Sequence, residues 1–495
     1  MRHDRQIFSS SGGTTILCTA PWSLVEKLLL AAVCAATLIF TCVTPPFQAP
    51  DENQHYMKAL LLSEGRVLAE KRGAMIGAEL PRTALDLHAI DFPTDVAPVP
   101  RRFDRAMLER SWTADDSRAG TRFADFPNVA NYAPSLYAPG AVGLRIGDAI
   151  GLPRLGAFYL GRFVNAAAGL AMLALALSLL PFGRFALLAT ALLPTFSYQT
   201  GSLSPDAVIN GIGFLGLALA LRIGFMDRAS GRSLGMFTVA PLLALAKGVY
   251  LPLIAAGLRW PSDRRDLRPW LLLAAMLTGA IAFLLWMKLS GGSQALYHIM
   301  SRKTGENVMT APLAAQLGVI LADPFAYLRL LCASIIERAP VYALQIVGRF
   351  GWNAILLPLL AYPLAGIMLC AGIFSGSGMR FSLRQRCWWL LVVLGGALLI
   401  ETAMYLTGTP LGADYIQGTQ GRYFLPLLPL ALLAVMPERA LPGARTVFGA
   451  SALLLLLVAM ASVLDSFWVH GFITADGMPP IGRLGDALLL PSPRW

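Results

Sequence analysis

The chain has 495 residues, of which 56% are hydrophobic and only 14% charged, and its mean hydropathy is +0.59. A water-soluble domain of this length cannot bury so much apolar surface, so the composition excludes a soluble protein and indicates a polytopic membrane protein. The net charge of +11 comes from short basic clusters between apolar runs. There is no stripe of basic and aromatic residues, so we expect no nucleic-acid partner.

The first 24 residues are polar, and we expect residues 1–24 to form a cytoplasmic tail. The apolar run that follows lacks a small-residue cleavage site, which indicates an uncleaved first span rather than a signal peptide. The six cysteines are scattered without a CxxC pair, so the sequence predicts neither a disulfide framework nor a zinc site.

The apolar runs predict an all-α transmembrane bundle of about eleven spans within residues 25–466, followed by an extracytoplasmic tail at 467–495. The stretch 234–259 is divided into two short arms, because the basic segments on both sides of it should face the cytoplasm. A re-entrant hairpin there fits nearly as well. The expected spans are 25–44, 157–180, 184–201, 205–225, 234–246, 247–259, 269–289, 352–374, 388–407, 421–437 and 445–466.

Two long segments then fall outside the cytoplasm, at 45–156 and 290–351, if the chain lies in a bacterial inner membrane with its N-terminus inside. In the first loop we expect residues 66–130 to be irregular with short helices, because they show no sustained period. In the second we expect two amphipathic helices, Pro312 to Ala322 and Pro324 to Arg338, along the membrane surface.

The first span is followed by Pro45-Pro46, and Pro50 then suits the first position of a new helix. Asp51 and Glu52 lie in its first turn, where the helix dipole favours negative charge, and His55 shares their face. The carboxylates could simply stabilise the helix start. Their place beside a membrane also suits a general base or, together with His55, a divalent cation such as Mg or Mn.

Polar residues inside later spans form a second candidate group. Asp206 and Asn210 lie four residues apart at the outer start of a span, and Lys247 lies between two apolar arms with Tyr250 close behind. Charged groups near mid-membrane are costly and usually face the protein interior. Asp206 is equally compatible with a helix start, and Lys247 with a side chain that reaches the membrane surface.

A third group lies at the outer mouth of a late span and consists of Asp414, Gln417, Gln420, Arg422 and Tyr423. A cation on the outer side runs against the usual charge bias, which indicates that Arg422 meets an anion such as a lipid phosphate. Contact with bulk phospholipid is the alternative.

Two smaller groups of polar and aromatic residues lie just before the second span and at its start. Asn131, Tyr132 and Tyr137 come just before it, where aromatic residues serve as an interfacial belt or as a platform for a sugar. Arg162 and Asn165 lie early in the span, and we interpret them as mainly structural.

Several of these residues belong to motifs that occur in a fixed order over roughly residues 40–440. With this ordered set the sequence resembles the bacterial integral-membrane family called domain of unknown function 2142, which is grouped with the C-type (GT-C) glycosyltransferases. The motifs are PPFQAPDENQHYMKALLLSEG, NYAPSLYAPG, LSPDAVING, LALAKGVYLPL, GRFGWNAILLP and QGRYFLPLLP.

The resemblance implies a GT-C-like enzyme that takes a sugar from a polyprenyl-phosphate donor and transfers it, with inversion, to an envelope glycan or lipid acceptor on the extracytoplasmic side. Asp51 or Glu52 would match the acidic residue of the first outer loop, and Asp51 is preferred as the base. Arg422, with Lys247, would meet the donor phosphate. A transporter or flippase, a glycan polymerase or ligase, and a non-catalytic assembly protein for lipid-linked glycans remain as alternatives.

Overall fold

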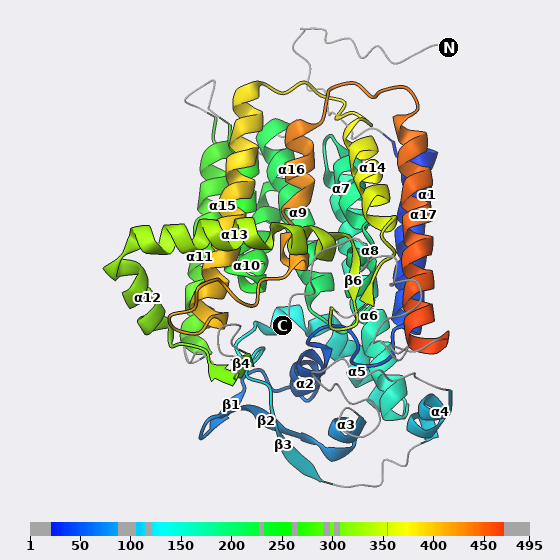
Figure 1. Ribbon diagram of the computed structural model, residues 1–495, viewed down its shortest axis with the longest axis vertical. Coiled ribbons are helices and arrows are strands. Elements are labelled where there is room, and N and C mark those ends of the chain that lie inside the picture. Colours follow the sequence, from blue (N-terminus) through cyan, green and yellow to red (C-terminus); the bar gives the residue numbers. More distant parts are fainter. Residues whose placement is uncertain are drawn as a thin grey trace.

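The computed structural model describes residues 21–87, 105–113, 120–226, 232–259, 266–290, 298–300, 307–353 and 355–469. It contains a bundle of apolar helices with a small mixed α/β region at one end (Figure 1). The fold class is therefore mostly helical, as the sequence predicts.

The long helices run roughly side by side along the bundle. They end at charged or turn-forming residues, and their apolar composition fits burial in lipid or protein. The bounds are α1 (Leu24–Val43), α6 (Arg154–Leu179), α9 (Asp206–Phe225), α11 (Arg268–Leu289), α15 (Leu383–Gly408) and α17 (Ala444–Leu464, continued by η5, Asp465–Val469).

α9 is the central helix of the bundle. Most of its apolar window, 89%, is buried, against 17% for α11, which lies at the edge. α9 packs against α6 on one side and against α10 (Arg232–Ala246) and η3 (Gly248–Gly257) on the other. Its first residue, Asp206, is thereby fixed near the middle of the molecule.

Shorter elements complete the bundle. Pro194 begins a new helix, so the expected span 184–201 is broken in two. The shorter elements are α7 (Arg184–Ala191), α8 (Pro194–Thr200), α14 (Ala361–Ile373), η4 (Gly421–Phe424) and α16 (Leu428–Val435). The expected helices at 352–374 and 421–437 are thus much shorter than predicted, because turns occupy their first residues.

The 232–257 stretch folds back on itself. Gly224, at the end of α9, lies so close to Gly257 that a Cβ on it would meet the Gly257 carbonyl oxygen at 2.0 Å. The end of η3 therefore returns to the end of the bundle at which α9 finishes. Neither arm has the roughly 20 residues that a span requires, and the turn between them places Lys247 inside the molecule.

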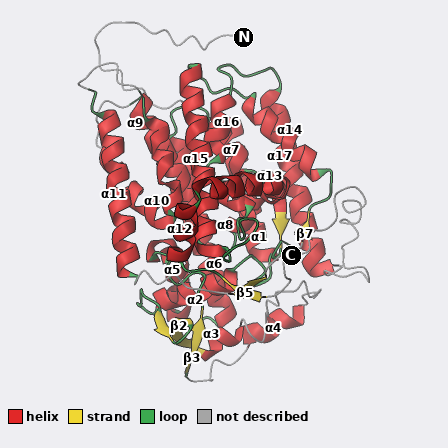
Figure 2. Ribbon diagram, turned by 60° about the vertical axis from the view of Figure 1, so that its left-hand side comes forward, coloured by secondary structure: helices red, strands yellow, loops and turns green. Residues whose placement is uncertain are grey.

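Two helices outside the regular bundle lie where the sequence predicts an amphipathic pair, and their place along the membrane surface stays a prediction. α12 (Leu313–Ala322) agrees with its prediction, whereas α13 (Pro324–Gly348) continues ten residues beyond the expected end at Arg338. α13 runs across the other helices in both Figure 1 and Figure 2. Its length and hydropathy would allow it to span a membrane, but its direction differs from that of the bundle.

The loop after α1 contains a sheet that the sequence analysis missed. The strands pair in the order β1-β2-β3, antiparallel throughout. The expectation of an irregular segment missed these strands, although the short helices that it included do occur there. The pairing of β2 with β3 joins residues that are 40 to 48 positions apart in the sequence, which no local pattern reveals. The elements here are α2 (Glu52–Ser63), β1 (Glu70–Arg72), β2 (Met75–Pro81), α3 (Arg82–Asp86), α4 (Arg105–Thr113), β3 (Thr121–Asp125), η2 (Pro134–Leu136) and α5 (Ala138–Ala149).

Two further hairpins follow α11 and α13. They are β4 (His298–Met300) with β5 (Asn307–Met309), and β6 (Arg349–Phe350) with β7 (Ile355–Leu356).

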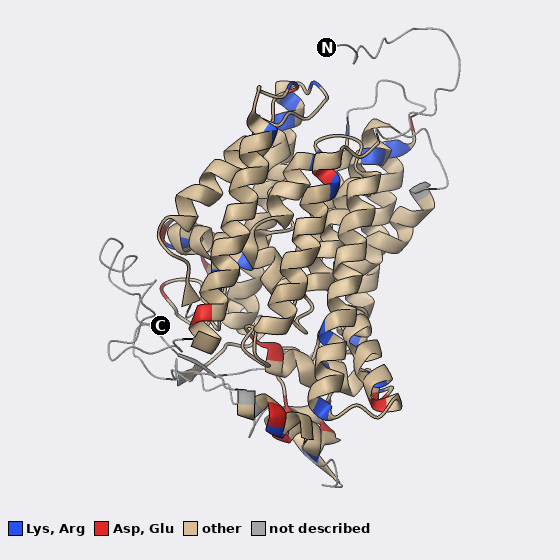
Figure 3. Cartoon of the chain, turned by 90° about the vertical axis from the view of Figure 1, so that its right-hand side faces the viewer, with Lys and Arg blue, Asp and Glu red and all other residues tan. Residues whose placement is uncertain are grey.

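Charged residues gather toward the ends of the bundle and leave its middle largely uncharged (Figure 3). At the end opposite the β1-β2-β3 sheet, turns from different parts of the chain pack together. For example, Gly183 donates to the Ser377 carbonyl and Arg445 donates to that of Ser375. The basic residues there include Arg184, Arg222, Arg259, Arg268, Arg380, Arg384, Arg386, Arg439 and Arg445.

Seven helices among the described residues are long and apolar enough to cross a membrane. Six coincide with expected spans, and the seventh is α13. The five other expected crossings are made of shorter elements, so the count of eleven stays a prediction. The described chain begins at one end of the bundle and finishes at the other, where Trp468 donates to the Val43 carbonyl at the end of α1.

Candidate functional site

The turn between α1 and α2 has a constrained backbone and lies next to the candidate site. Phe47 and Asp51 both adopt left-handed conformations, with φ of 64° and 63°. Side chains other than glycine rarely take this conformation, and Asp is among the few that tolerate it. Surrounding contacts hold the turn, since Trp352 donates to the Phe47 carbonyl and Tyr198 to that of Gln48.

Arg162 of α6 and Glu52 of α2 form a fully buried ion pair behind this turn. The distance from Arg162 Nη2 to Glu52 Oε2 is 2.6 Å, and both side chains have an exposed fraction of zero. The other Arg162 bonds include those to the Thr41, Thr44 and Pro45 carbonyls. All five guanidinium donors are therefore used within the protein.

Glu52 is equally saturated. Each of its oxygens accepts one bond from Arg162 and one from a backbone N–H, that of Phe47 or that of Leu203. Four donors fill the acceptor positions of the carboxylate and tie α1, α2, α6 and the start of α9 together. This arrangement suits a structural role for both Glu52 and Arg162 and leaves Asp51 as the accessible carboxylate.

Asp51 stands at the N-cap of α2, yet its side chain does not cap that helix. Instead Asp51 Oδ2 accepts a hydrogen bond of 2.7 Å from Arg422 Nη2. Its side chain is 29% exposed, in contrast to that of Glu52. An N-cap carboxylate normally stabilises its own helix, so the orientation of Asp51 toward Arg422 indicates another task.

Arg422 joins two carboxylates. Besides Asp51, it approaches Asp206 with 3.2 Å between Nη1 and Oδ2, and it donates to Gln199 Oε1 at 3.3 Å. These partners come from α2, α9 and α8, while Arg422 itself lies in η4. Arg422 is buried, so the charges face one another with little screening by solvent.

Lys247 completes the group from the turn between α10 and η3. Its Nζ lies 3.7 Å from the centre of the Tyr423 ring, which Arg422 also contacts. Asp51, Asp206 and Arg422 are all near enough to interact with it electrostatically, but no carboxylate of the described chain pairs with it directly. We call Asp51, Asp206, Lys247 and Arg422 the charged cluster.

Tyr250 fixes the relative position of two of these segments. Its hydroxyl donates to the Tyr423 carbonyl at 2.8 Å, which joins η3 to η4. Asn210 lies one turn after Asp206 in α9 and is buried with it. Asn165 donates to the carbonyls of Ser202 and Ser204 and so holds the loop that leads into α9.

Aromatic and amide groups of the first loop border the cluster. His55 shares a hydrogen bond of 2.9 Å with the Tyr137 hydroxyl and lies beside the Tyr132 ring. Burial lowers the His55 pKa to about 3, so this ring is neutral at physiological pH. The Asn131 carbonyl accepts a bond from Trp286 of α11, which anchors the segment to the bundle.

The predicted metal trio does not form a site. Glu52 is occupied by four N–H donors, and His55 is bonded to Tyr137. Within the described ranges no three His, Cys, Asp or Glu side chains come together in a metal-binding arrangement.

Five residues near the cluster were not predicted. Gln199 binds Arg422, while Gln345, Arg349 and Asn353 line a small pocket beside it, together with the predicted Gln420. The pocket lining also includes Thr195 and Arg422 itself. Arg349 and Asn353 lie in the GRFGWN motif, whose density of polar residues next to apolar runs was the available signal.

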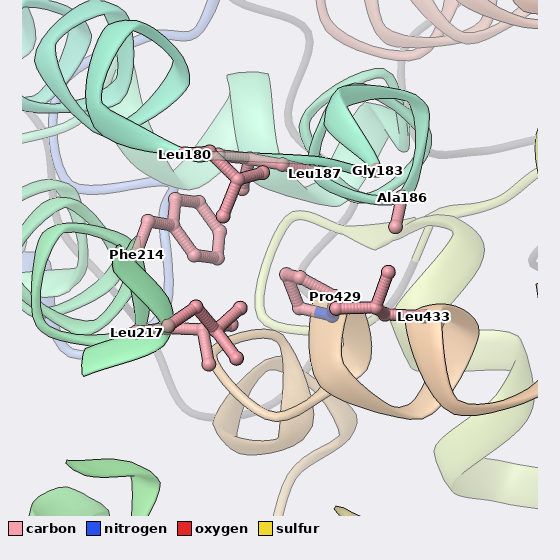
Figure 4. Close-up of a pocket in the computed structure, with 9 residues that line it drawn as sticks. Leu180, Gly183, Ala186, Leu187, Phe214, Leu217, Pro429 and Leu433 are labelled. Carbon is pink, nitrogen blue, oxygen red and sulfur yellow. The ribbon is translucent and has the colours of Figure 1, made fainter. Parts of the chain in front are cut away.

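A second small pocket lies elsewhere and is apolar. It is bounded by residues such as Leu187 of α7, Phe214 of α9 and Leu433 of α16 (Figure 4). It has no charged side chain in its lining, so it is a packing defect rather than a place for chemistry.

A comparison with protein-family models shows to which family the chain belongs. The model described as "Predicted membrane protein (DUF2142)" matches residues 34–431. The chain belongs to this family. All members of the charged cluster lie within the matched part of this DUF2142 protein. No curated protein and no solved structure matches the chain.

Proposed function

We propose that this DUF2142 protein is a GT-C-type membrane glycosyltransferase that moves a sugar from a polyprenyl-phosphate donor to an envelope glycan or lipid acceptor. The observation that supports this most is the charged cluster. Two carboxylates and two cations from four separate segments meet next to the first loop, although each is costly to bury. Such a concentration of ionisable groups is characteristic of a functional site.

Asp51 is the proposed base. Its Oδ2 is held by Arg422, whereas Oδ1 accepts no hydrogen bond within the described part of the chain. Its side chain is the more exposed of the two cluster carboxylates, at 29% against 11% for Asp206. Asp51 is set on a rigid turn that the Glu52–Arg162 pair secures. Asp206 would orient Arg422 from the other side.

The proposed reaction is a single displacement. Asp51 takes the proton from an acceptor hydroxyl as that oxygen forms a bond to the anomeric carbon. The bond between the anomeric carbon and the donor phosphate oxygen breaks, and the phosphate leaves with the electron pair. Lys247 and Arg422 stabilise the charge that develops on this phosphate. The sugar is transferred with inversion.

Tyr132, Tyr423 and Asn131 border the cluster and would contact the sugar. We place the reaction on the extracytoplasmic side of a bacterial inner membrane, because the basic end of the bundle would then face the cytoplasm.

A second candidate function is the transport of a lipid-linked anion without chemistry. Interrupted helices favour it, since α7 and α8 are separated at Pro194 and η3 returns at Lys247. Transporters place such breaks at the substrate site. The difference is that a transporter moves its ligand with the sugar still attached.

The experiment uses a strain that lacks the gene. The envelope glycans and the pool of polyprenyl-phosphate sugars are compared with those of the parent strain by mass spectrometry. We expect one sugar substituent to disappear from the envelope and its lipid-phosphate donor to accumulate. If both profiles are unchanged, the transferase proposal fails; accumulation of a complete lipid-linked glycan would favour transport.

A further inference from the structure

The GRFGWN motif contains a strained turn to which the proposed reaction assigns no role. The turn follows β6, and its residues Gly351, Trp352 and Asn353 all have left-handed backbones, with φ of 54°, 56° and 65°. Glycine tolerates this conformation, but it is unfavourable for a side chain as bulky as that of tryptophan. Such strain persists only where surrounding contacts hold it, and it is concentrated at functional sites. The contacts of this turn therefore indicate what it does.

Trp352 joins this turn to the one that carries Asp51. Its indole N–H donates to the Phe47 carbonyl at 2.9 Å, across 305 positions of the sequence. Phe47 and Asp51 are themselves left-handed, with φ of 64° and 63°. Two strained turns from distant parts of the chain are thus bonded directly, and each helps to hold the conformation of the other.

Tyr198 of α8 makes a second link between the two turns. Its hydroxyl accepts a hydrogen bond of 3.1 Å from the Gly351 N–H and donates to the Gln48 carbonyl at 3.0 Å. A hydroxyl can donate one bond and accept others, so both links exist at the same time. The Tyr198 ring packs against Phe40 and Phe350, with centroids 5.7 and 4.6 Å away. The buried ring therefore holds the hydroxyl as a fixed bridge.

The end of α13 and α8 also support Arg422. Gln345 of α13 accepts a hydrogen bond of 2.7 Å from the Gly421 N–H through its Oε1, and its carbonyl accepts one of 2.8 Å from Thr195 of α8. Gln199 of the same helix accepts from Arg422 at 3.3 Å. The end of α13, the GRFGWN motif and α8 thus contact both sides of the charged cluster, the turn before α2 and η4. They set the distance between the two sides.

We propose that Trp352 and Tyr198 are positioning residues for Asp51. Their hydrogen bonds hold the backbone of the turn that carries Asp51, so they act through this carboxylate and keep it against Arg422. A base that is displaced by a fraction of its hydrogen-bonding distance loses much of its effect on proton transfer. This inference rests on the proposed function, and it gives the GRFGWN motif a role in it.

The test measures kcat and the donor KM of sugar transfer in proteoliposomes that contain the full-length protein. Trp352→Phe keeps an aromatic ring but removes the indole N–H, so the Phe47 carbonyl loses its donor. We expect kcat to fall about 10- to 100-fold and the donor KM to change less than about twofold, because the cations that meet the phosphate stay in place. Trp388→Phe is the matched control. It also loses an indole bond to a backbone carbonyl, that of Ala255, but at the basic end of the bundle, and it should keep wild-type kinetics.

A double-mutant cycle separates positioning from a general loss of structure. In the Asp51→Asn background, Trp352→Phe should lower the remaining transfer less than about twofold, because no base is left to position. A structural defect would lower transfer by the same factor in both backgrounds. Tyr198→Phe repeats the cycle if Trp352→Phe does not fold. It keeps the ring contacts of Tyr198 and removes only the hydroxyl bridge.

Three results would overturn the positioning role alone. The first is wild-type kcat in Trp352→Phe or Tyr198→Phe. The second is an equal loss of transfer with and without Asp51, and the third is a raised donor KM at unchanged kcat, which would mean that Trp352 contacts the donor. If the folded wild type itself transfers no sugar, the proposed function fails and the positioning role fails with it.

Discussion

Adjacent carboxylates at the start of α2 have opposite environments. Glu52 is sealed inside the protein by four donors, while Asp51, one residue earlier, is partly exposed and faces Arg422. The left-handed backbone at Asp51 causes this divergence, because it turns the two side chains toward different partners. The roles of the structural carboxylate, Glu52, and of the proposed base, Asp51, can therefore be tested separately by substitution.

Glu52→Gln should destabilise the protein strongly. The change leaves the buried Arg162 without a compensating charge, for which we expect a loss of about 3–5 kcal/mol in the free energy of unfolding. Asp51→Asn should cost less than about 1 kcal/mol, because Arg422 keeps Asp206 and the site is partly solvated. Thermal unfolding of both variants measures the difference; equal losses would contradict the assigned roles.

His55 makes stability depend on pH. Burial lowers its pKa from 6.5 to about 3, so between these values the unfolded chain binds a proton that the folded protein does not. The contribution of His55 to the free energy of unfolding is therefore complete above pH 6.5. It decreases as the pH falls toward 3, by at most about 1.4 kcal/mol per pH unit. Unfolding midpoints measured from pH 8 to pH 4 should fall less steeply for His55→Gln. An unchanged slope would show that His55 is not buried as a neutral ring.

The element η4, which carries Arg422, packs closely against α13. A Cβ on Gly421 would lie 2.5 Å from the Tyr342 carbonyl oxygen and 2.7 Å from Gln345 Cβ. Only glycine allows this approach, and the position of Arg422, the next residue, depends on it. Close packing against α13 thus explains why the QGRYF motif has a glycine at this position.

Gly421→Ala should displace η4 from α13, lower the unfolding midpoint by several degrees and abolish the function of the charged cluster. Gly395→Ala is the matched control, because a Cβ at Gly395 in α15 meets nothing within 4 Å. Thermal unfolding together with complementation of a deletion strain checks both. Wild-type behaviour of Gly421→Ala would show that this contact does not position Arg422.

The sequence patterns predicted the long helices and the main residues of the candidate site. They predicted few of the residues to which these side chains bind. Asp51, Asp206, Lys247 and Arg422 stand out because charge is rare in apolar runs. That Arg422 binds Gln199, more than two hundred positions earlier, depends on tertiary packing and has no local signal. The β2–β3 pairing was missed for the same reason.

The molecule as a whole has a basic end and an end that carries the β1-β2-β3 sheet. If the basic end faces the cytoplasm, the first loop and the charged cluster lie on the opposite side of the membrane. This orientation is a requirement of the proposed reaction with a donor and an acceptor outside the cytoplasm.

Single cysteines in a variant without the six native ones test the orientation. Lys71 in β1 and Arg439 in the turn before α17 are both exposed and stand at opposite ends of the bundle. A membrane-impermeant maleimide should label Lys71→Cys in intact spheroplasts and Arg439→Cys only after permeabilisation. The reverse pattern would contradict the proposed side of the reaction.

The central proposal is that Asp51 acts as the base in glycosyl transfer, and a transfer assay in proteoliposomes tests it most directly. Purified wild type, Asp51→Asn and the control Asp148→Asn are given a radiolabelled polyprenyl-phosphate sugar and an envelope extract as acceptor. The control changes a partly exposed carboxylate that pairs with Arg154. Wild type and Asp148→Asn should transfer the label, and Asp51→Asn should bind the donor but transfer at least about a hundredfold more slowly. Equal transfer by Asp51→Asn, or no transfer by the folded wild type with any envelope acceptor, would contradict the proposal.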